Sequence, residues 1–239
     1  MRRVHLIIET STGAGAVGLW RPGHGLAASR EWESLHNHTA ELMPAVRALV
    51  EEAGGTERLT GIGAATGPGG FSALRAGLGV AKGLAFASGL PLVGVSTLEA
   101  TAYPHRGSGA VVCAVIVAGR ALAGWAMFDA RGGGWRRLSD DRVTDIDELA
   151  ASLRGEMLLA GEGAAAWAER LIAENGEARL AEERQPASRL CGAGALTAER
   201  LERGERDAPA GLAPHYARPP GIGTPKPPAR VGRGRAARG

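Results

Sequence analysis

One order of secondary structure occurs twice along the chain, and this duplication limits the fold more than any other feature. Apolar runs bounded by glycine turns predict strands, and apolar residues at helical spacing predict helices. The first half reads strand, strand, strand, helix, strand, helix at residues 4–11, 16–20, 26–33, 35–53, 59–66 and 72–88. The second half repeats that order at residues 111–118, 121–128, 135–143, 145–154, 157–161 and 164–175.

Such a duplication describes two lobes that face each other across a cleft. We expect an α/β protein with an actin-like (ribonuclease H-like) duplicated fold, in which each lobe is a mixed sheet flanked by helices. The first lobe is predicted over residues 1–104 and the second over 105–217. Residues 186–203 predict a further helix, which we expect to return to the first lobe. The fold alone does not name a function.

The basic character of the chain is concentrated in its last residues. The formal net charge is +3, but residues 218–239 hold six basic residues and no acid. Without them the acidic residues outnumber the basic ones. Glycine, proline and arginine dominate this tail, which predicts disorder. It could contact RNA phosphates, or act only as a solubilising segment, since it has no aromatic residues for stacking bases.

The sequence predicts a cytoplasmic protein. No apolar stretch reaches the roughly 20 helical residues that a bilayer span requires. At the start of the chain, Glu9 interrupts the apolar run before a signal-peptide core would be complete.

A glycine turn at residues 67–70 stands between a predicted strand and a predicted helix. Its backbone N–H groups could approach a phosphate, but it matches neither the P-loop nor the dinucleotide fingerprint, and a structural turn is the favoured reading. In the helix behind it, Ala73, Gly77, Ala81 and Ala85 recur at every fourth position and form a narrow stripe. Another helix could approach closely there, although spacing alone favours packing inside the same lobe.

An actin-like ATPase needs carboxylates in both lobes to hold Mg²⁺ and to orient water. Glu9 stands at a suitable place in the first lobe, but residues 117–120 of the second lobe supply no acid. We therefore expect no autonomous ATP hydrolysis. We also predict no catalytic residue, no metal site and no cofactor of the chain's own. A self-sufficient actin-like ATPase or kinase is the enzymatic alternative, and an RNA-binding module led by the basic tail is the binding alternative.

Residues 66–78 (TGPGGFSALRAGL) and 81–85 (AKGLA) resemble the GPGSFTGLRIG…AKGLA signature of the TsaB (YeaZ) family. The resemblance continues at residues 7–11, 94–100, 161–164 and 214–219. It implies a non-catalytic subunit of the bacterial machinery that builds threonylcarbamoyladenosine on tRNA, at the adenosine next to the anticodon.

The resemblance also implies partners. They are the catalytic subunit TsaD, which the chain would bind and activate, the ATP-hydrolysing subunit TsaE, tRNA through the complex, and a second copy when the chain is alone. ATP and Mg²⁺ would belong to the assembled complex.

Related subunits pair through their first two helices, which suggests a set of interface residues. This set consists of Leu42, Met43, Val46, Leu49, Gly69, Phe71, Leu74, Arg75, Gly77, Val80, Ala81 and Leu84. Thr10, Ser11, Gly161 and Gly163 are weaker candidates for nucleotide contacts, because the turns that carry them also have structural explanations.

Overall fold

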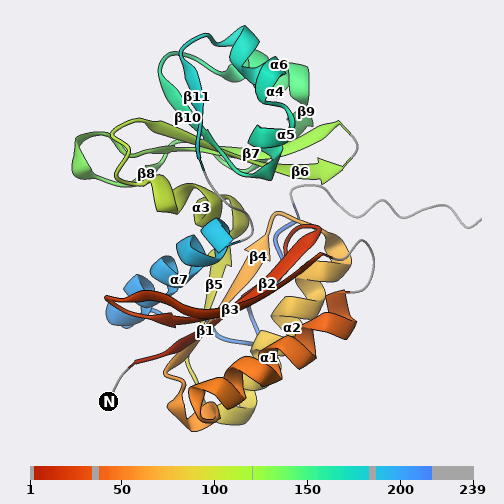
Figure 1. The fold of residues 1–239 in the computed structure, drawn as a ribbon, viewed down its shortest axis with the longest axis vertical. Helices are drawn as coiled ribbons and strands as arrows, with labels where there is room; N and C mark the ends of the chain where they lie inside the picture. The colour runs from red at the N-terminus through yellow and green to blue at the C-terminus, as the bar shows by residue number, and fades with distance from the viewer. Residues whose placement is uncertain (1–2, 34–37, 120, 183–186, 217–239) are drawn as a thin grey trace, which may run out of the picture.

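The computed structural model describes residues 3–33, 38–119, 121–182 and 187–216, which form two lobes, each built on one β-sheet (Figure 1). The predicted duplicated α/β fold is confirmed. Among the described residues, no helix combines the length and the apolar character needed to cross a bilayer.

The first sheet has the strand order β3-β2-β1-β4-β5. Its strands are β1 (His5–Glu9), β2 (Ala14–Arg21), β3 (Gly25–Glu33), β4 (Gly61–Gly67) and β5 (Leu92–Ser96). β1 pairs antiparallel with β2 and parallel with β4, so it joins the opening hairpin to the parallel part of the sheet. All residues of β1 are buried, because helices cover both faces of the sheet.

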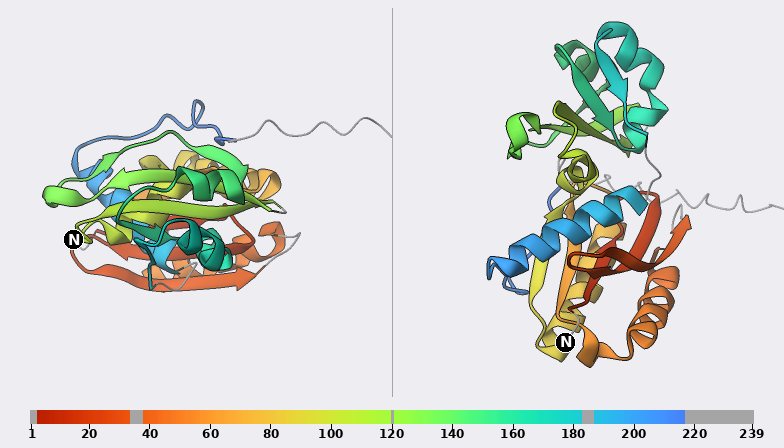
Figure 2. Two further views of the ribbon diagram at one scale, coloured as in Figure 1. Left: turned by 90° about the horizontal axis from the view of Figure 1, so that it is seen from above. Right: turned by 60° about the vertical axis from the view of Figure 1, so that its left-hand side comes forward.

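Three long helices cover this sheet (Figure 2). α1 (His38–Ala53) and α2 (Phe71–Ser88) lie side by side on one face, and α7 (Ala187–Glu202) crosses the other. Apolar residues of α1 and α2 pack onto the sheet in one core cluster, which includes Leu42, Leu49, Leu78, Ala81 and Ile62.

Single turns of 3-10 helix occur at Thr56–Arg58, Tyr103–His105 and Arg131–Gly133.

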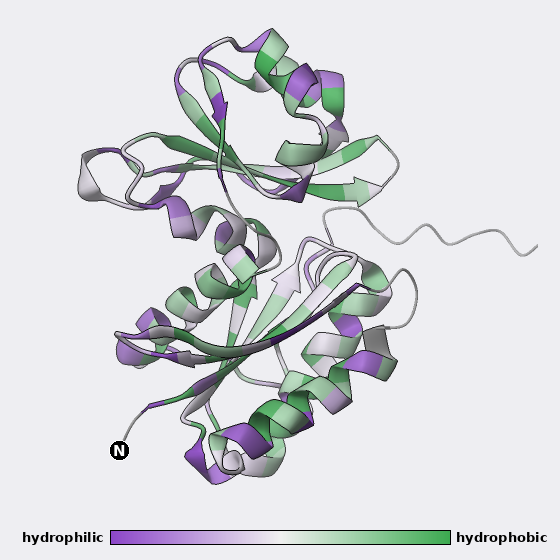
Figure 3. Cartoon of the chain, in the orientation of Figure 1, coloured by the Kyte–Doolittle hydropathy of each residue, from purple (hydrophilic) through white to green (hydrophobic). Residues whose placement is uncertain are grey.

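The second sheet repeats the plan with the order β11-β10-β6-β7-β8, and β9 also pairs with β7. Its strands are β6 (Val111–Gly119), β7 (Leu122–Asp129), β8 (Arg136–Arg137), β9 (Arg142–Asp145), β10 (Met157–Ala160) and β11 (Ala178–Leu180). β6 takes the place of β1, antiparallel to β7 and parallel to β10. Both β6 and β7 are mainly hydrophobic (Figure 3). The helices α4 (Ile146–Ser152), α5 (Glu162–Ala166) and α6 (Ala168–Glu174) share a core cluster with this sheet.

The last helix of each half of the chain packs against the sheet of the other lobe. α3 (Thr97–Ala102), which follows β5 in the chain and is capped by Ser96, packs against β6 and β7 of the second sheet. α7 follows β11 but packs against all five strands of the first sheet. The two helices touch each other, and a Cβ at Gly192 of α7 would collide with the carbonyl oxygen of Ala100 in α3. The chain therefore ties its lobes together through a closely packed pair of helices.

Two expectations for the second lobe are wrong, and one of its strands was not expected. The strand expected over residues 135–143 is two short strands, because a loop that hydrogen-bonds Leu138 and Ser139 to Met127 replaces the middle of the ladder. The helix expected over 164–175 divides into α5 and α6 at Trp167, where φ is −122° and ψ is 22°. β11 was not expected at all, because its three residues are too few to show a period.

Candidate functional site

The glycine turn between β4 and α2 packs against the chain's own backbone. A Cβ at Gly67 would collide with the carbonyl oxygen of His215, and one at Gly69 with that of Ser11. The N–H of Gly70 donates to the Ser11 carbonyl over 2.7 Å. These glycines therefore let the turn fit between the β1–β2 connection and the C-terminal segment, as a structural turn does.

The stripe of small residues on α2 faces inward. Ala73, Gly77, Ala81 and Ala85 are all buried. A Cβ at Gly77 would collide with Oγ1 of Thr10, whose hydroxyl donates to the Ala73 carbonyl over 2.8 Å. The hypothesis that this stripe receives a helix from another molecule is therefore wrong, because the first sheet of the same chain already covers it.

The twelve residues expected at a partner interface divide into two groups. Six are buried in the core of the first lobe and cannot form a surface, which corrects the expectation for Leu42, Val46, Leu49, Leu74, Gly77 and Ala81. Six are exposed or partly exposed, namely Met43, Gly69, Phe71, Arg75, Val80 and Leu84. Only this second group remains available to a partner.

The opposite face of α2 is open to solvent, and Arg75 is the one residue of it that the sequence analysis placed at the interface. At 100° per residue, five of its exposed residues fall within an arc of about 80°. We call this surface the α2 outer face; it comprises Ser72, Arg75, Gly79, Gly83 and Phe86. Phe86 is 87% exposed, and a Cβ at either glycine would meet nothing within 4 Å. The sequence shows two more glycines four residues apart in the same helix, but this spacing alone does not say which stripe faces solvent.

Two further large apolar side chains of α1 and α2 are exposed. Met43 of α1 is 48% exposed, and Phe71 at the first turn of α2 is 40% exposed. The ring centroids of Phe71 and Tyr216 lie 4.9 Å apart. The guanidinium of Arg75 lies over the Phe71 ring, 4.7 Å from the centroid of that ring. The C-terminal segment is thus fastened at the start of α2, beside the outer face.

Charged residues meet between the lobes, at the carboxyl ends of β1 and β10. Arg189, in the first turn of α7, lies within salt-bridge distance of Glu9 in the first lobe and Glu162 in the second. The side chain of Glu9 is fully buried, and that of Arg189 is 1% exposed. A carboxylate, a guanidinium and a second carboxylate therefore form a bridge between the two lobes.

The four residues considered for nucleotide contacts serve the fold. Thr10 bonds to α2, as described above, and the hydroxyl of Ser11 donates to Glu9 over 2.5 Å. A Cβ at Gly161 would collide with the carbonyl oxygen of Val115, and one at Gly163 would also lie against β6. Two of these residues are buried and bonded within the chain, and two are packed against a strand, so each has a role in the fold.

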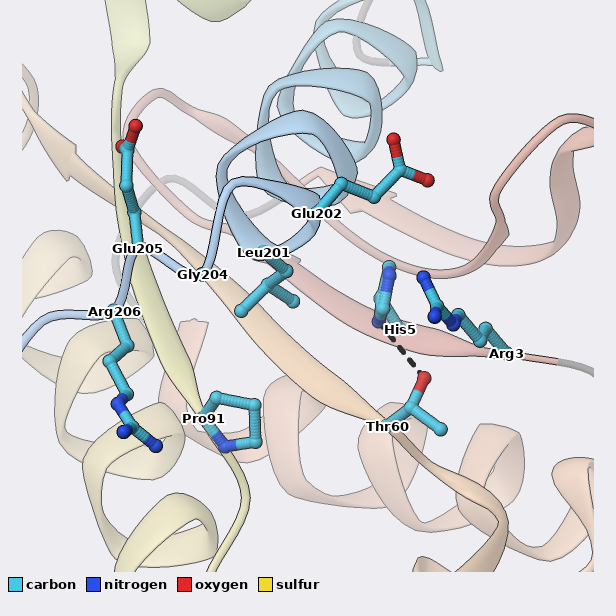
Figure 4. Close-up of a pocket in the computed structure, with 9 residues that line it drawn as sticks. All are labelled: Arg3, His5, Thr60, Pro91, Leu201, Glu202, Gly204, Glu205 and Arg206. Carbon is cyan, nitrogen blue, oxygen red and sulfur yellow. Dashed lines mark hydrogen bonds between the residues drawn. The ribbon is translucent and has the colours of Figure 1, made fainter.

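A cavity of about 360 Å³ lies at the other end of the first sheet (Figure 4). Charges of both signs line it, including Arg3 and Glu205, and His5 and Thr60 share a hydrogen bond of 3.2 Å. Burial, with the nearby charge of Arg3, lowers the pKa of His5 to about 4, so its imidazole is neutral at pH 7. None of the expected site residues lines this cavity.

Comparisons with known proteins find similarity to proteins of tRNA threonylcarbamoyladenosine biosynthesis. A family model described as TsaD, tRNA N6-adenosine threonylcarbamoyltransferase, matches residues 33–169. The tRNA threonylcarbamoyladenosine biosynthesis protein TsaB of Escherichia coli (strain K12) is 34% identical over 175 residues, which cover 68% of this chain and 72% of that protein. The solved structure of YeaZ from Pseudomonas aeruginosa has a TM-score of 0.73 at 30% identity, over 90% of this chain and 99% of that one.

A more distant structure bears on the fold alone. Component A of the (R)-2-hydroxyglutaryl-CoA dehydratase of Acidaminococcus fermentans has a TM-score of 0.54 at 11% identity, over 84% of this chain and 99% of that one.

Two duplicated sheets with exchanged helices, together with these structural neighbours, define the class as proteins of the actin-like fold. Within that class, the sequence identity with TsaB of Escherichia coli and the share of both chains that it covers decide the family. The chain belongs to the TsaB (YeaZ) family of tRNA threonylcarbamoyladenosine biosynthesis.

Proposed function

We propose that this chain is a non-catalytic subunit that binds a TsaD-type catalytic subunit through the α2 outer face and activates it for tRNA threonylcarbamoylation. The observation that carries the proposal is the open pair Gly79 and Gly83 beside the exposed Phe86. Membership of the TsaB family supplies the pathway.

The two glycines have no explanation inside the chain. Each costs an α-helix about 1 kcal/mol relative to alanine, and neither contacts anything that a side chain would displace. A helix from another molecule would explain both, because glycine lets two helix backbones approach closely. Phe86 and Met43 would then supply apolar area at the rim of that contact.

Similarity to TsaD supports the choice of partner. The TsaD family model matches more than half of this chain, including α1 and α2, so a TsaD-type subunit carries comparable elements. Two chains of one fold can pair through equivalent faces, as two identical chains do around a two-fold axis. When the chain is alone, the same face would pair with a second copy.

Catalysis would belong to the partner. In this chain Glu9 is buried against Arg189, so it is not free to orient a water or a metal ion. ATP, Mg²⁺, a TsaE-type ATPase and the tRNA would join in the assembled complex.

Two substitutions on the outer face test the proposal. Gly83→Leu places a branched side chain in the expected contact, and Phe86→Ser removes its most exposed ring. We expect each to weaken binding to a TsaD-type subunit at least tenfold by isothermal titration calorimetry, because burying a phenylalanine is worth about 2 kcal/mol. Ala151→Leu, at an exposed position of α4 in the second lobe, is the matched control and should bind normally.

The outcome is informative in either direction. If both variants fold and bind the catalytic subunit as tightly as the wild-type chain, the outer face is not the interface. Sustained ATP hydrolysis by the isolated chain would instead favour the enzymatic alternative.

A further inference from the structure

We propose that the guanidinium of Arg189 occupies, between the two lobes, the place where an actin-like ATPase would hold Mg²⁺ and a nucleotide. In sheets with parallel strands, ligands bind outside the carboxyl ends of those strands. Glu9 ends β1 and Glu162 follows β10, so the two carboxylates mark this place in both lobes. Arg189 lies between them.

The guanidinium is held from both sides. In the first lobe, its Nε lies 3.4 Å from Oε2 of Glu9, and its Nη2 donates to Oγ1 of Thr12 over 2.7 Å. In the second lobe, its Nη1 donates to Oε2 of Glu162 over 2.8 Å. A planar fork with several N–H donors suits this arrangement of two carboxylates and a hydroxyl. One side chain therefore joins the two lobes.

The same residues do not fit a Mg²⁺ ion and a nucleotide. The second oxygen of Glu9, Oε1, accepts from the N–H of Ser11 over 2.7 Å and from its hydroxyl over 2.5 Å. The other oxygen, Oε2, is buried without a hydrogen-bond partner and lies within salt-bridge distance of the Arg189 guanidinium. Mg²⁺ needs near-octahedral oxygen ligands and usually retains several waters, whereas this place holds a buried cation. The fold suggests a nucleotide site between the lobes, and the side chain of Arg189 occupies that place.

This inference concerns the isolated chain and goes beyond the partner role. Its failure would leave the α2 outer face unaffected, and a failed interface would leave Arg189 in place. It also predicts that any nucleotide required by the assembled complex binds elsewhere.

Removal of the guanidinium is the first test. Arg189→Ala leaves Glu9 buried without its counter-charge, and we expect the Tm to fall by about 10 °C. Arg170→Ala is the matched control, because Arg170 makes two ion pairs, with Asp147 and Glu174, on the open surface. Its Tm should change by no more than about 3 °C.

Chemical rescue distinguishes a specific role of the Arg189 guanidinium from a general packing role of the side chain. Millimolar ethylguanidinium should restore most of the lost Tm of Arg189→Ala and should leave the wild-type chain and Arg170→Ala unchanged. Adding Glu9→Gln to Arg189→Ala should recover part of the loss, because it removes the uncompensated charge. If Arg189→Ala does not fold, the Tm of Arg189→Lys is compared with that of the wild-type chain instead, and a smaller decrease is expected.

Mg-ATP provides the opposing test. The wild-type chain should show no Tm shift with millimolar Mg-ATP, and hydrogen exchange at the β1–β2 turn should stay the same. A Tm rise together with slower exchange at that turn would overturn the proposal. So would an Arg189→Ala variant as stable as the wild-type chain, or one that ethylguanidinium does not stabilise.

Discussion

Replacing Gly79 and Gly83 with alanine should make the protein more stable and its binding weaker. Both glycines lie in the interior of α2, and a Cβ at either would meet nothing within 4 Å. Each substitution gains about 1 kcal/mol of helix propensity, so the double variant should require about 2 kcal/mol more free energy to unfold. For a domain of this size that gain corresponds to a Tm increase of about 4–8 °C.

The two methyl groups should have the opposite effect on the complex. They would stand in the contact between α2 and the partner helix and hold the backbones apart, so we expect affinity for a TsaD-type subunit to fall at least tenfold, or about 1.4 kcal/mol. Circular dichroism gives the Tm, and isothermal titration calorimetry gives the affinity. Gly176→Ala, at an open loop position of the second lobe, is the control and should leave binding unchanged.

An increase in Tm together with a decrease in affinity distinguishes a binding defect from a folding defect. A double variant that is less stable than the wild-type chain would show that α2 does not present this face to solvent. A double variant that is more stable and still binds normally would show that the glycines have no part in partner recognition.

Two further predictions concern pH and the tail. The folded chain keeps His5 neutral down to about pH 4, whereas its ordinary pKa is 6.5, so stability should fall between pH 6.5 and 4 by up to about 3 kcal/mol. His5→Gln should flatten that part of the curve, and a wild-type protein equally stable across the interval would refute the assignment. Truncation after Tyr216 keeps the contact with Phe71, so Tm, partner affinity and the tRNA affinity of the complex should be unchanged. A salt-dependent loss of tRNA binding would favour the RNA-binding alternative.

The duplicated plan was accessible from sequence because its main elements are long and strongly patterned. β1, β6 and β7 are buried apolar runs between turns, and α2 ends at a glycine in the left-handed conformation. β8, β9 and β11 were misread or missed because they have two to four residues each. Their pairing depends on neighbouring strands rather than on their own composition.

The face of α2 that meets solvent could not be read from spacing. Small residues recur every fourth position in two stripes of this helix, one through Gly77 and one through Gly79 and Gly83. Only the fold places Thr10 against Gly77 and leaves the other stripe open.

The bridge at Arg189 was equally inaccessible. This residue and Thr12 are 177 positions apart in the sequence, and no local pattern joins them. The exchange of α7 onto the first sheet brings them together.

Reconstituted tRNA threonylcarbamoylation tests the central claim most directly. The TsaD-type subunit would be assayed with its tRNA and cofactors in three forms: without this chain, with the wild-type chain, and with Gly83→Leu. We expect efficient modification only in the reaction that contains the wild-type chain. Modification at the same rate when the chain is left out, or with Gly83→Leu in its place, would contradict the proposed role.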